Sequence, residues 1–137
     1  LIERDKLITL LTANGYHRTD SVSDARRAAE EGGCCVLLKG TDTLVAYGER
    51  VAINSTGGAQ LATAGTGDVL SGIIGALLAR GMDSYDAART GACAHGHASE
   101  LYLESTSWPA ESMIATDLPS YLPGAFGEIH SEAPSSS

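Results

Sequence analysis

The chain has 137 residues, and 43% of them are hydrophobic, which is enough apolar material for the core of one domain. Nine Lys and Arg residues against 17 Asp and Glu residues give a formal charge of -8. This acidic balance argues against a nucleic-acid-binding surface or a polybasic membrane anchor. Sixteen residues are glycine, and nine of them lie between Gly57 and Gly96. We therefore expect turns or close backbone packing in that segment, where glycine is concentrated.

The first part of the chain predicts two helices and a buried strand. Apolar residues recur through residues 1–11, and an Asn-Gly pair follows, which is typical of a short helix with a glycine stop. Residues 21–31 predict a second helix, because polar residues within 20–23 can cap its start and two glycines end it. Residues 34–38 are a short apolar run, which predicts a strand buried on both faces in a parallel sheet.

The next part predicts a hairpin, a long loop and an apolar helix. Residues 44–47 and 50–53 are short strands joined by a two-residue Gly-Glu turn, the pattern of a β-hairpin. Residues 54–67 form a loop rich in Gly, Ser, Thr and Ala. Residues 68–80 predict a buried helix whose apolar run is shorter than the roughly 20 residues of a bilayer span. Two glycines inside this helix indicate that another backbone packs closely against it.

The last part predicts one long helix, one short helix and a tail. Ser84 is predicted to cap a helix that runs to residue 104. This helix carries a small-residue stripe, which consists of Ala88, Gly91, Ala92, His95 and Ser99. We expect the stripe to pack against the glycine side of the preceding helix. A short helix is predicted from about residue 116 to residue 122. Residues 127–137 are predicted to be a disordered tail that follows a domain of residues 1–126.

The cysteines and histidines predict no metal-ligating residues. Cys34, Cys35 and Cys93 lack CxxC spacing, and the first two point to opposite faces if they lie on a strand. We expect reduced, packing cysteines in a cytoplasmic protein. His95 and His97 are two residues apart on a helix, so they point about 200° apart and cannot share one ion. His95 is predicted to be a hydrogen-bonded packing residue.

The most informative pattern is the turn Gly65-Thr66-Gly67, which leads directly into the apolar helix. Such a turn lets backbone N–H groups converge, and the helix N-terminus adds about half a positive charge. An acidic protein could thus hold phosphate oxygens with local backbone groups. Asp68 follows the turn, and the local pattern leaves two roles open for it. It can cap the helix, or it can accept a proton from a substrate hydroxyl that attacks a terminal phosphate.

Similar alternatives remain for the polar side chains near the turn. The hydroxyls of Thr63 and Thr66 can bind a ligand or can bond the local backbone. Asn54, at the end of a predicted strand, can hydrogen-bond a phosphate or a metal-bound water. Lys39 directly follows the buried strand, and it is either a solvated strand end or a ligand-binding group.

Four segments of the chain resemble one family. The run Asn-Ser-Thr-Gly-Gly-Ala-Gln at residues 54–60, continued by LATAGTGDVLSGIIGALLARG, is similar to the C-terminal signature of the ADP/ATP-dependent NAD(P)H-hydrate dehydratases. Residues 36–46 resemble the family's Lys-Gly-x-x-Thr strand and turn, residues 94–98 its His-Gly helix, and residues 115–123 its closing helix. The resemblance implies the C-terminal half of a three-layer α/β ribokinase-like fold, with a parallel sheet, a β-hairpin and flanking helices.

The resemblance also implies a site and a reaction. The implied nucleotide-binding residues are Lys39, Gly40, Thr41, Asp42, Thr43 and Gly67. The implied phosphate loop consists of Thr63, Ala64, Gly65, Thr66 and Gly67. Asp68 would bind the hydrated nicotinamide and act as the catalytic base. The reaction would use ADP or ATP as phosphoryl donor, with Mg²⁺ bridging the phosphates, to dehydrate (S)-NADHX or NADPHX to NADH or NADPH.

A ribokinase-like domain is considerably longer than this chain, so we expect residues 1–126 to be the C-terminal part of one, as a fragment or a natural truncation. The expected partners are the small-molecule substrate, an adenine nucleotide and further copies of the chain, with no nucleic acid and no membrane. Two alternatives stay open. A small-molecule kinase of the thiazole or hydroxymethylpyrimidine type shares the Gly-x-Gly-Asp turn, and a truncated remnant would bind nucleotide without chemistry.

Overall fold

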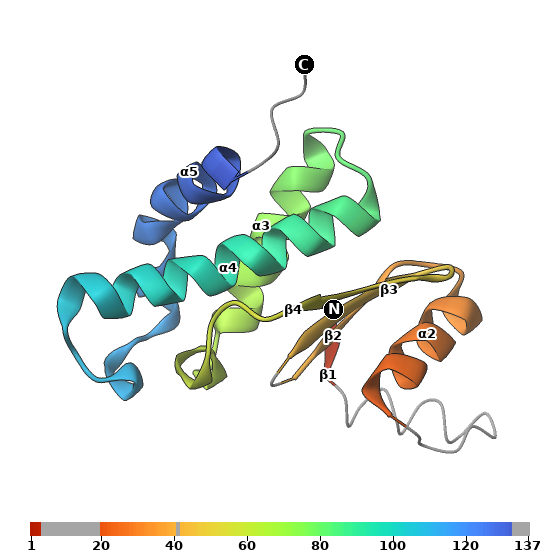
Figure 1. The fold of residues 1–137 in the computed structure, drawn as a ribbon, viewed down its shortest axis with the longest axis horizontal. Helices are drawn as coiled ribbons and strands as arrows, with labels where there is room; N and C mark the ends of the chain where they lie inside the picture. Colours follow the sequence, from red (N-terminus) through yellow and green to blue (C-terminus); the bar gives the residue numbers. More distant parts are fainter. Residues whose placement is uncertain (4–19, 41, 133–137) are drawn as a thin grey trace.

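The computed structural model describes residues 1–3, 20–40 and 42–132, and Figure 1 shows their arrangement. The strands are β1 (Ile2–Glu3), β2 (Val36–Lys39), β3 (Thr43–Tyr47) and β4 (Arg50–Asn54). The α-helices are α2 (Ser21–Gly32), α3 (Thr66–Ala79), α4 (Ser84–Thr106) and α5 (Leu122–Glu132), with 3₁₀ turns at Ala59–Ala62, Ala110–Ser112 and Ala115–Tyr121. Within the described part of the chain, no helix combines the length and the apolar character that crossing a membrane requires.

The four strands form one sheet in the order β1-β2-β3-β4. Only β1 and β2 are parallel, whereas β2 with β3 and β3 with β4 are antiparallel. The prediction of a parallel sheet therefore holds only for the pair β1 and β2. The other pairs are antiparallel because of the length of their connections. A parallel pair needs a crossover of a dozen or more residues, whereas only a few residues separate β2 from β3 and β3 from β4. The predicted hairpin is confirmed, with Tyr47 opposite Arg50 and Gly48 at a φ of 59°.

The start of the chain differs from the predicted helix. Ile2 and Glu3 form strand β1, and they pair with Leu38 and Lys39 of β2. Apolar spacing alone cannot reveal this pairing, because the hydrogen-bond partners come from a strand more than 30 residues further along the chain. The rest of that prediction falls on residues 4–19, which lie outside the described residues.

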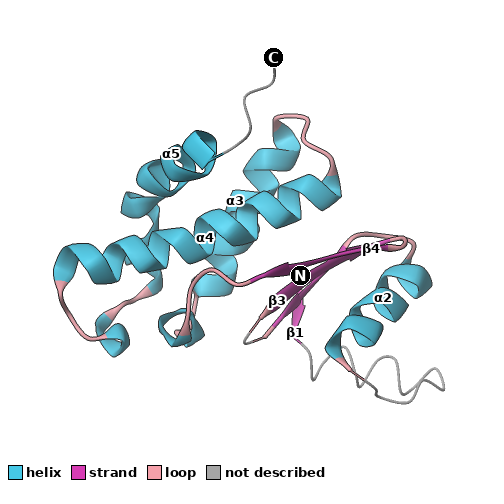
Figure 2. Cartoon of the chain, viewed as in Figure 1, coloured by secondary structure: helices cyan, strands magenta, loops and turns pink. Residues whose placement is uncertain are grey.

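Helix α2 covers one face of the sheet, as Figures 1 and 2 show. Asp20 caps its start by accepting a hydrogen bond of 2.9 Å from the N–H of Ser23, and Gly33 ends it with a φ of 60°. The predicted bounds are confirmed to within one residue. The contact between α2 and the sheet consists of Ala25, Ala28, Ala29, Leu38, Leu44 and Ala46. Cys34 is exposed in the turn after α2, so the prediction that it is a packing residue is wrong.

Helices α3 and α4 cover the opposite face, which completes three layers (Figure 1). The small-residue stripe of α4 is buried, but the glycine side of α3 is not its partner. A Cβ atom on Gly91 would stand 2.7 Å from Cγ1 of Ile74, whereas Gly72 and Gly75 have no heavy atom within 4 Å of theirs. The stripe therefore receives the branched side chains of α3. The prediction that another backbone packs closely against the two glycines of α3 is wrong for the described residues, because its glycine side is exposed.

A third cluster joins α4 to the C-terminal elements, and it consists of Ala98, Tyr102, Met113, Leu118 and Ala125. Ala125 lies in α5, which continues to Glu132. The prediction of a tail beginning at Gly127 is therefore wrong for the residues up to Glu132, and residues 133–137 lie outside the described residues. Pro123 does not end the helix, because it stands in the first turn, where a missing N–H breaks no helical hydrogen bond.

Candidate functional site

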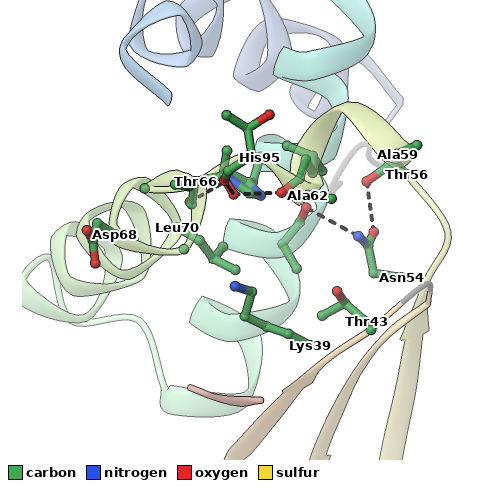
Figure 3. A pocket seen from close by; sticks show the side chains of 18 residues that line it. Lys39, Thr43, Asn54, Thr56, Ala59, Ala62, Thr66, Asp68, Leu70 and His95 are labelled. Atoms are coloured by element: carbon green, nitrogen blue, oxygen red, sulfur yellow. Dashed lines mark hydrogen bonds between the residues drawn. The ribbon is translucent and has the colours of Figure 1, made fainter. Parts of the chain in front are cut away.

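A cavity of about 690 Å³ opens where the ends of β2, β3 and β4 meet the first turn of α3 and the middle of α4. Figure 3 shows the side chains that line it. The sequence-predicted site residues in its lining are Lys39, Gly40, Thr43, Thr63, Ala64, Gly65, Thr66, Gly67 and Asp68. Residues from two turns and one helix start, up to 29 positions apart in the chain, are thus brought to one cavity.

The first turn of α3 presents its backbone to this cavity. Gly65 is the N-cap with a φ of 89°, a left-handed conformation that favours glycine. The N–H of Asp68 donates to the carbonyl of Gly65 at 3.1 Å, and the N–H of Thr66 donates to the carbonyl of Thr63 at 3.4 Å. Gly67 is the second residue of the helix, so its N–H has no intrahelical partner. The helix dipole adds a partial positive charge at this position, which suits an anion.

Lys39 adds a side-chain charge to the same end of the cavity. It is the last residue of β2, and its Nζ atom lies 2.9 Å from the position that a Cβ atom on Gly67 would occupy. The ammonium group therefore fills the space beside Gly67 that a side chain at this position would occupy. Lys39 is half-buried and lines the cavity, so it is not merely a solvated strand end.

The threonine hydroxyls near the turn bond the local backbone. Thr66 Oγ1 donates to the carbonyls of Leu61 at 2.7 Å and of Thr63 at 2.9 Å. Thr63 Oγ1 lies 3.2 Å from the local carbonyl of Gln60 and 3.3 Å from the distant carbonyl of Met113, and it can donate to either. Asn54 lines the cavity, but its amide nitrogen donates to the carbonyl of Ala92 at 3.3 Å. These side chains hold the shape of the loop.

Asp68 is the third residue of α3, and the cap of this helix is Gly65. The capping role that the sequence left open for Asp68 is therefore wrong. Its side chain is exposed at the rim of the cavity and points away from Lys39 and His95 in Figure 3. Across the described ranges, no group of three or more His, Cys, Asp or Glu side chains is arranged to hold a metal ion.

The remaining residues of the predicted strand-turn divide into two groups. Gly40 and Thr43 line the cavity beside Lys39, and the backbone of Thr43 pairs with Asn54 across the hairpin. Asp42 is exposed and lies outside the cavity lining. Thr41 is outside the described residues.

Sequence reasoning missed a set of contacts that attach the loop after β4 to α4. Thr56 Oγ1 donates to the carbonyl of Cys93 at 3.2 Å, and the N–H of Gly57 donates to Glu100 Oε1 at 2.8 Å. The prediction that His95 is a hydrogen-bonded, buried residue is confirmed, but His95 also lines the cavity. The available signal was its place in the small-residue stripe, which faces the glycine-rich loop.

The fold and the cavity define the class of this protein: an α/β protein with a glycine-capped helix start and a lysine at one polar cavity. The family profile described as NAD(P)H-hydrate dehydratase matches residues 3–124. The chain belongs to the NAD(P)H-hydrate dehydratase family.

Three known proteins illustrate the similarity. The ADP-dependent (S)-NAD(P)H-hydrate dehydratase of Neisseria meningitidis serogroup B is 45% identical over 89 residues, which are 64% of this chain and 30% of that protein. A structure of the Bacillus subtilis ADP/ATP-dependent NAD(P)H-hydrate dehydratase, co-crystallised with ATP/Mg²⁺ and soaked with CoA, has a TM-score of 0.72 at 29% identity. That match covers 77% of this chain and 39% of the Bacillus chain.

A ribokinase-like superfamily protein from Enterococcus faecalis V583 has a TM-score of 0.58 at 25% identity, and the match covers 77% of this chain and 37% of that one. The predicted ribokinase-like α/β fold is confirmed at this level. The chain thus spans between about a third and two fifths of the length of these three relatives.

Proposed function

We propose that this chain is the nucleotide-binding, C-terminal part of an ADP/ATP-dependent (S)-NAD(P)H-hydrate dehydratase. The observation that carries the proposal is the contact between Lys39 and Gly67 at the start of α3. It combines an ammonium group, an unpaired helix N–H and a helix dipole at one end of a cavity, and each of these favours phosphate oxygens. The relatives named as ADP-dependent and ADP/ATP-dependent dehydratases support ADP or ATP as the phosphate ligand.

The proposed roles follow the positions of the residues. Lys39, Gly40 and Thr43 bind the nucleotide, together with Thr41 and Asp42, and Gly67 donates its N–H to the phosphates. Asp68 accepts the proton of the ring hydroxyl as that oxygen bonds to the terminal phosphorus. The phosphorylated oxygen then leaves the ring as inorganic phosphate, and the neighbouring carbon loses a proton. The products are NADH or NADPH, phosphate and the nucleotide with one phosphate fewer.

The lining residues fit a Mg²⁺ ion that arrives with the nucleotide. Mg²⁺ usually keeps several waters and binds substrate phosphates with only one or two carboxylates. Among the described residues of the lining, Asp68 is the one carboxylate, which is too few for a cage of protein ligands. When bound, the ion would neutralise charge on the phosphates of the nucleotide.

The proposal includes the place of this chain in a larger domain. The glycine side of α3 is open, with no heavy atom within 4 Å of a Cβ on Gly72 or Gly75, and the matched segment covers only 30% and 39% of the Neisseria and Bacillus relatives. We therefore propose that residues 1–126 supply one wall of the active site. We also propose that the complete enzyme works in the cytoplasm as a homo-oligomer, which light scattering of the purified protein would test.

Two measurements test the proposed function. Calorimetric titration with ADP and ATP, each with Mg²⁺, should show binding by this chain, and no binding to either nucleotide would overturn the proposal. Incubation of the longest natural form of the protein with NADHX, nucleotide and Mg²⁺ should regenerate NADH, which is followed by absorbance. Accumulation of a phosphorylated product would instead indicate the kinase alternative, and binding without chemistry would indicate the remnant.

The proposed catalytic role of the Asp68 carboxylate is tested by a matched pair of variants. Asp68→Asn should lower the rate of NADH formation by about 10²- to 10⁴-fold, the usual contribution of a general base. Asp86 is the control, since it is an exposed carboxylate in the first turn of α4 and lies outside the cavity. Asp86→Asn should leave the rate unchanged. Equal rates for the two variants would exclude the proposed role of Asp68.

A further inference from the structure

His95 connects helix α4 to the start of helix α3. Its side chain is 6% exposed, and its Nε2 atom lies 2.9 Å from the carbonyl oxygen of Thr66, the first residue of α3. A carbonyl oxygen can only accept, so Nε2 carries the hydrogen and donates it. Figure 3 shows this contact beside the cavity.

Thr66 is held from two sides. Its carbonyl accepts from His95 of α4, and its hydroxyl donates to the carbonyls of Leu61 and Thr63 in the preceding loop. Thr66 itself is 2% exposed, so its buried polar groups depend on these protein partners. The orientation of the first turn of α3 therefore depends on the His95 hydrogen bond as well as on the loop.

That turn carries the groups on which the proposed function depends. Gly67 and Asp68 directly follow Thr66, and Gly67 is in contact with Lys39. Displacement of such groups by about 1 Å is enough to lose much of their effect on a bound substrate.

We propose that His95 is a positioning residue of the nucleotide site: its hydrogen bond to the Thr66 carbonyl holds the first turn of α3 in its position beside Lys39. The inference rests on the proposed function. The charge state of the ring agrees with it: burial lowers the pKa of His95, the hydrogen bond to Thr66 raises it by less, and the nearby Lys39 charge lowers it, so that the net shift is downward. A neutral ring donates to Thr66 without placing a second positive charge beside Lys39.

The hydrogen bond is tested by two variants of similar polarity and different reach. The amide nitrogen of glutamine in His95→Gln can stand where Nε2 stood, whereas the shorter side chain in His95→Asn cannot reach the Thr66 carbonyl. We expect His95→Asn to weaken ADP or ATP binding by about tenfold, the factor that corresponds to one hydrogen bond, and His95→Gln to restore most of the affinity.

A control separates positioning from loss of packing. Tyr102 lies on the same helix, is 2% exposed and forms a hydrogen bond of 3.1 Å with Ser112 outside the cavity. Tyr102→Phe should lower the thermal stability but leave the nucleotide dissociation constant unchanged. If His95→Asn also loses stability and still binds nucleotide like the wild type, His95 is only a packing residue and the inference is overturned.

A second measurement needs no variant. In the wild-type protein, saturation with nucleotide should shift the imidazole ¹⁵N signals of His95, while those of His97, two residues away beside Glu100, should move less. Unchanged His95 signals at saturation would overturn the inference. If the wild type binds neither nucleotide, the proposed function itself fails. The two failures are therefore distinguishable.

Discussion

The ammonium group of Lys39 fills the side-chain position that Gly67 leaves empty, since Nζ lies 2.9 Å from the site of a Cβ atom on Gly67. The two residues are 28 positions apart, and they belong to different layers of the fold. Glycine at position 67 thus does more than loosen a turn, because it leaves the space that a strand-end lysine occupies. The contact unites the two segments from which the nucleotide site is proposed to be built.

Gly67→Ala should therefore separate ligand binding from stability. The added methyl group meets the far end of a flexible side chain, so Lys39 can move away and the fold should persist. Alanine in a helix gains about 0.5 to 1 kcal/mol over glycine, which offsets part of the strain. We expect a near-wild-type melting temperature and a nucleotide affinity lowered by about tenfold, measured by calorimetry.

Gly72→Ala is the control for this variant. A Cβ atom at position 72 has no heavy atom within 4 Å, and the residue lies two turns or fewer from Gly67 on the same helix. It should raise the free energy of unfolding by about 0.5 to 1 kcal/mol and leave nucleotide affinity unchanged. If both variants bind nucleotide like the wild type, the Lys39 contact is unimportant for the site.

Gly96→Ala should be strongly destabilising. A Cβ atom there would stand 2.0 Å from Thr56 Oγ1 and 2.5 Å from the carbonyl carbon of Thr56, so side-chain rotation cannot relieve the clash. We expect a loss of about 3 kcal/mol in the free energy of unfolding, measured by urea denaturation. Gly75→Ala, with open space around its Cβ position, should instead be stabilising. Equal stability of the two variants would show that the loop does not pack on α4 as described.

Stability should fall on mild acidification because of His95. Burial lowers its pKa, so below the unfolded-state value of about 6.5 the unfolded chain binds more protons than the folded one. The unfolding free energy should therefore decrease as the pH falls from about 6.5 towards the lower folded-state pKa. His95→Gln should reduce this slope, and His130→Gln, which removes an exposed histidine of α5, should retain it. Parallel slopes for wild type and His95→Gln would contradict the prediction.

Asp83 should stabilise the start of α4. The sequence predicted Ser84 as the cap, but Asp83 is the residue whose side chain accepts from the N–H of Asp86, at 3.0 Å. This hydrogen bond lowers the pKa of the carboxyl group. Asp83→Ala should lower the melting temperature by about 3 °C at neutral pH, and Asp83→Asn, which keeps an acceptor, by less. If both variants lower the melting temperature equally, the stabilisation comes from the charge of Asp83 and not from its hydrogen bond.

Local physical chemistry made several features predictable from sequence. Asp20 before α2 and Gly33 after it satisfy backbone groups within a few residues, so the helix bounds could be found without knowledge of any partner. The Gly48 turn requires a positive φ, which is a property of the turn itself. Gly65, which precedes α3 with a φ of 89°, is of the same kind.

Partner choice was decided only by the tertiary structure. Ile2 is in a strand because it pairs with the backbone of β2. The side of α3 that contacts α4 depends on the packing of Ile74 against Gly91. The contacts of Lys39 with Gly67 and of His95 with Thr66 depend in the same way on how the layers stack. Capping, turn conformation and periodicity depend on residues a few positions apart, so they can be predicted from the sequence. Packing partners are selected among all the surfaces of the chain at once, so they emerge only in the folded molecule.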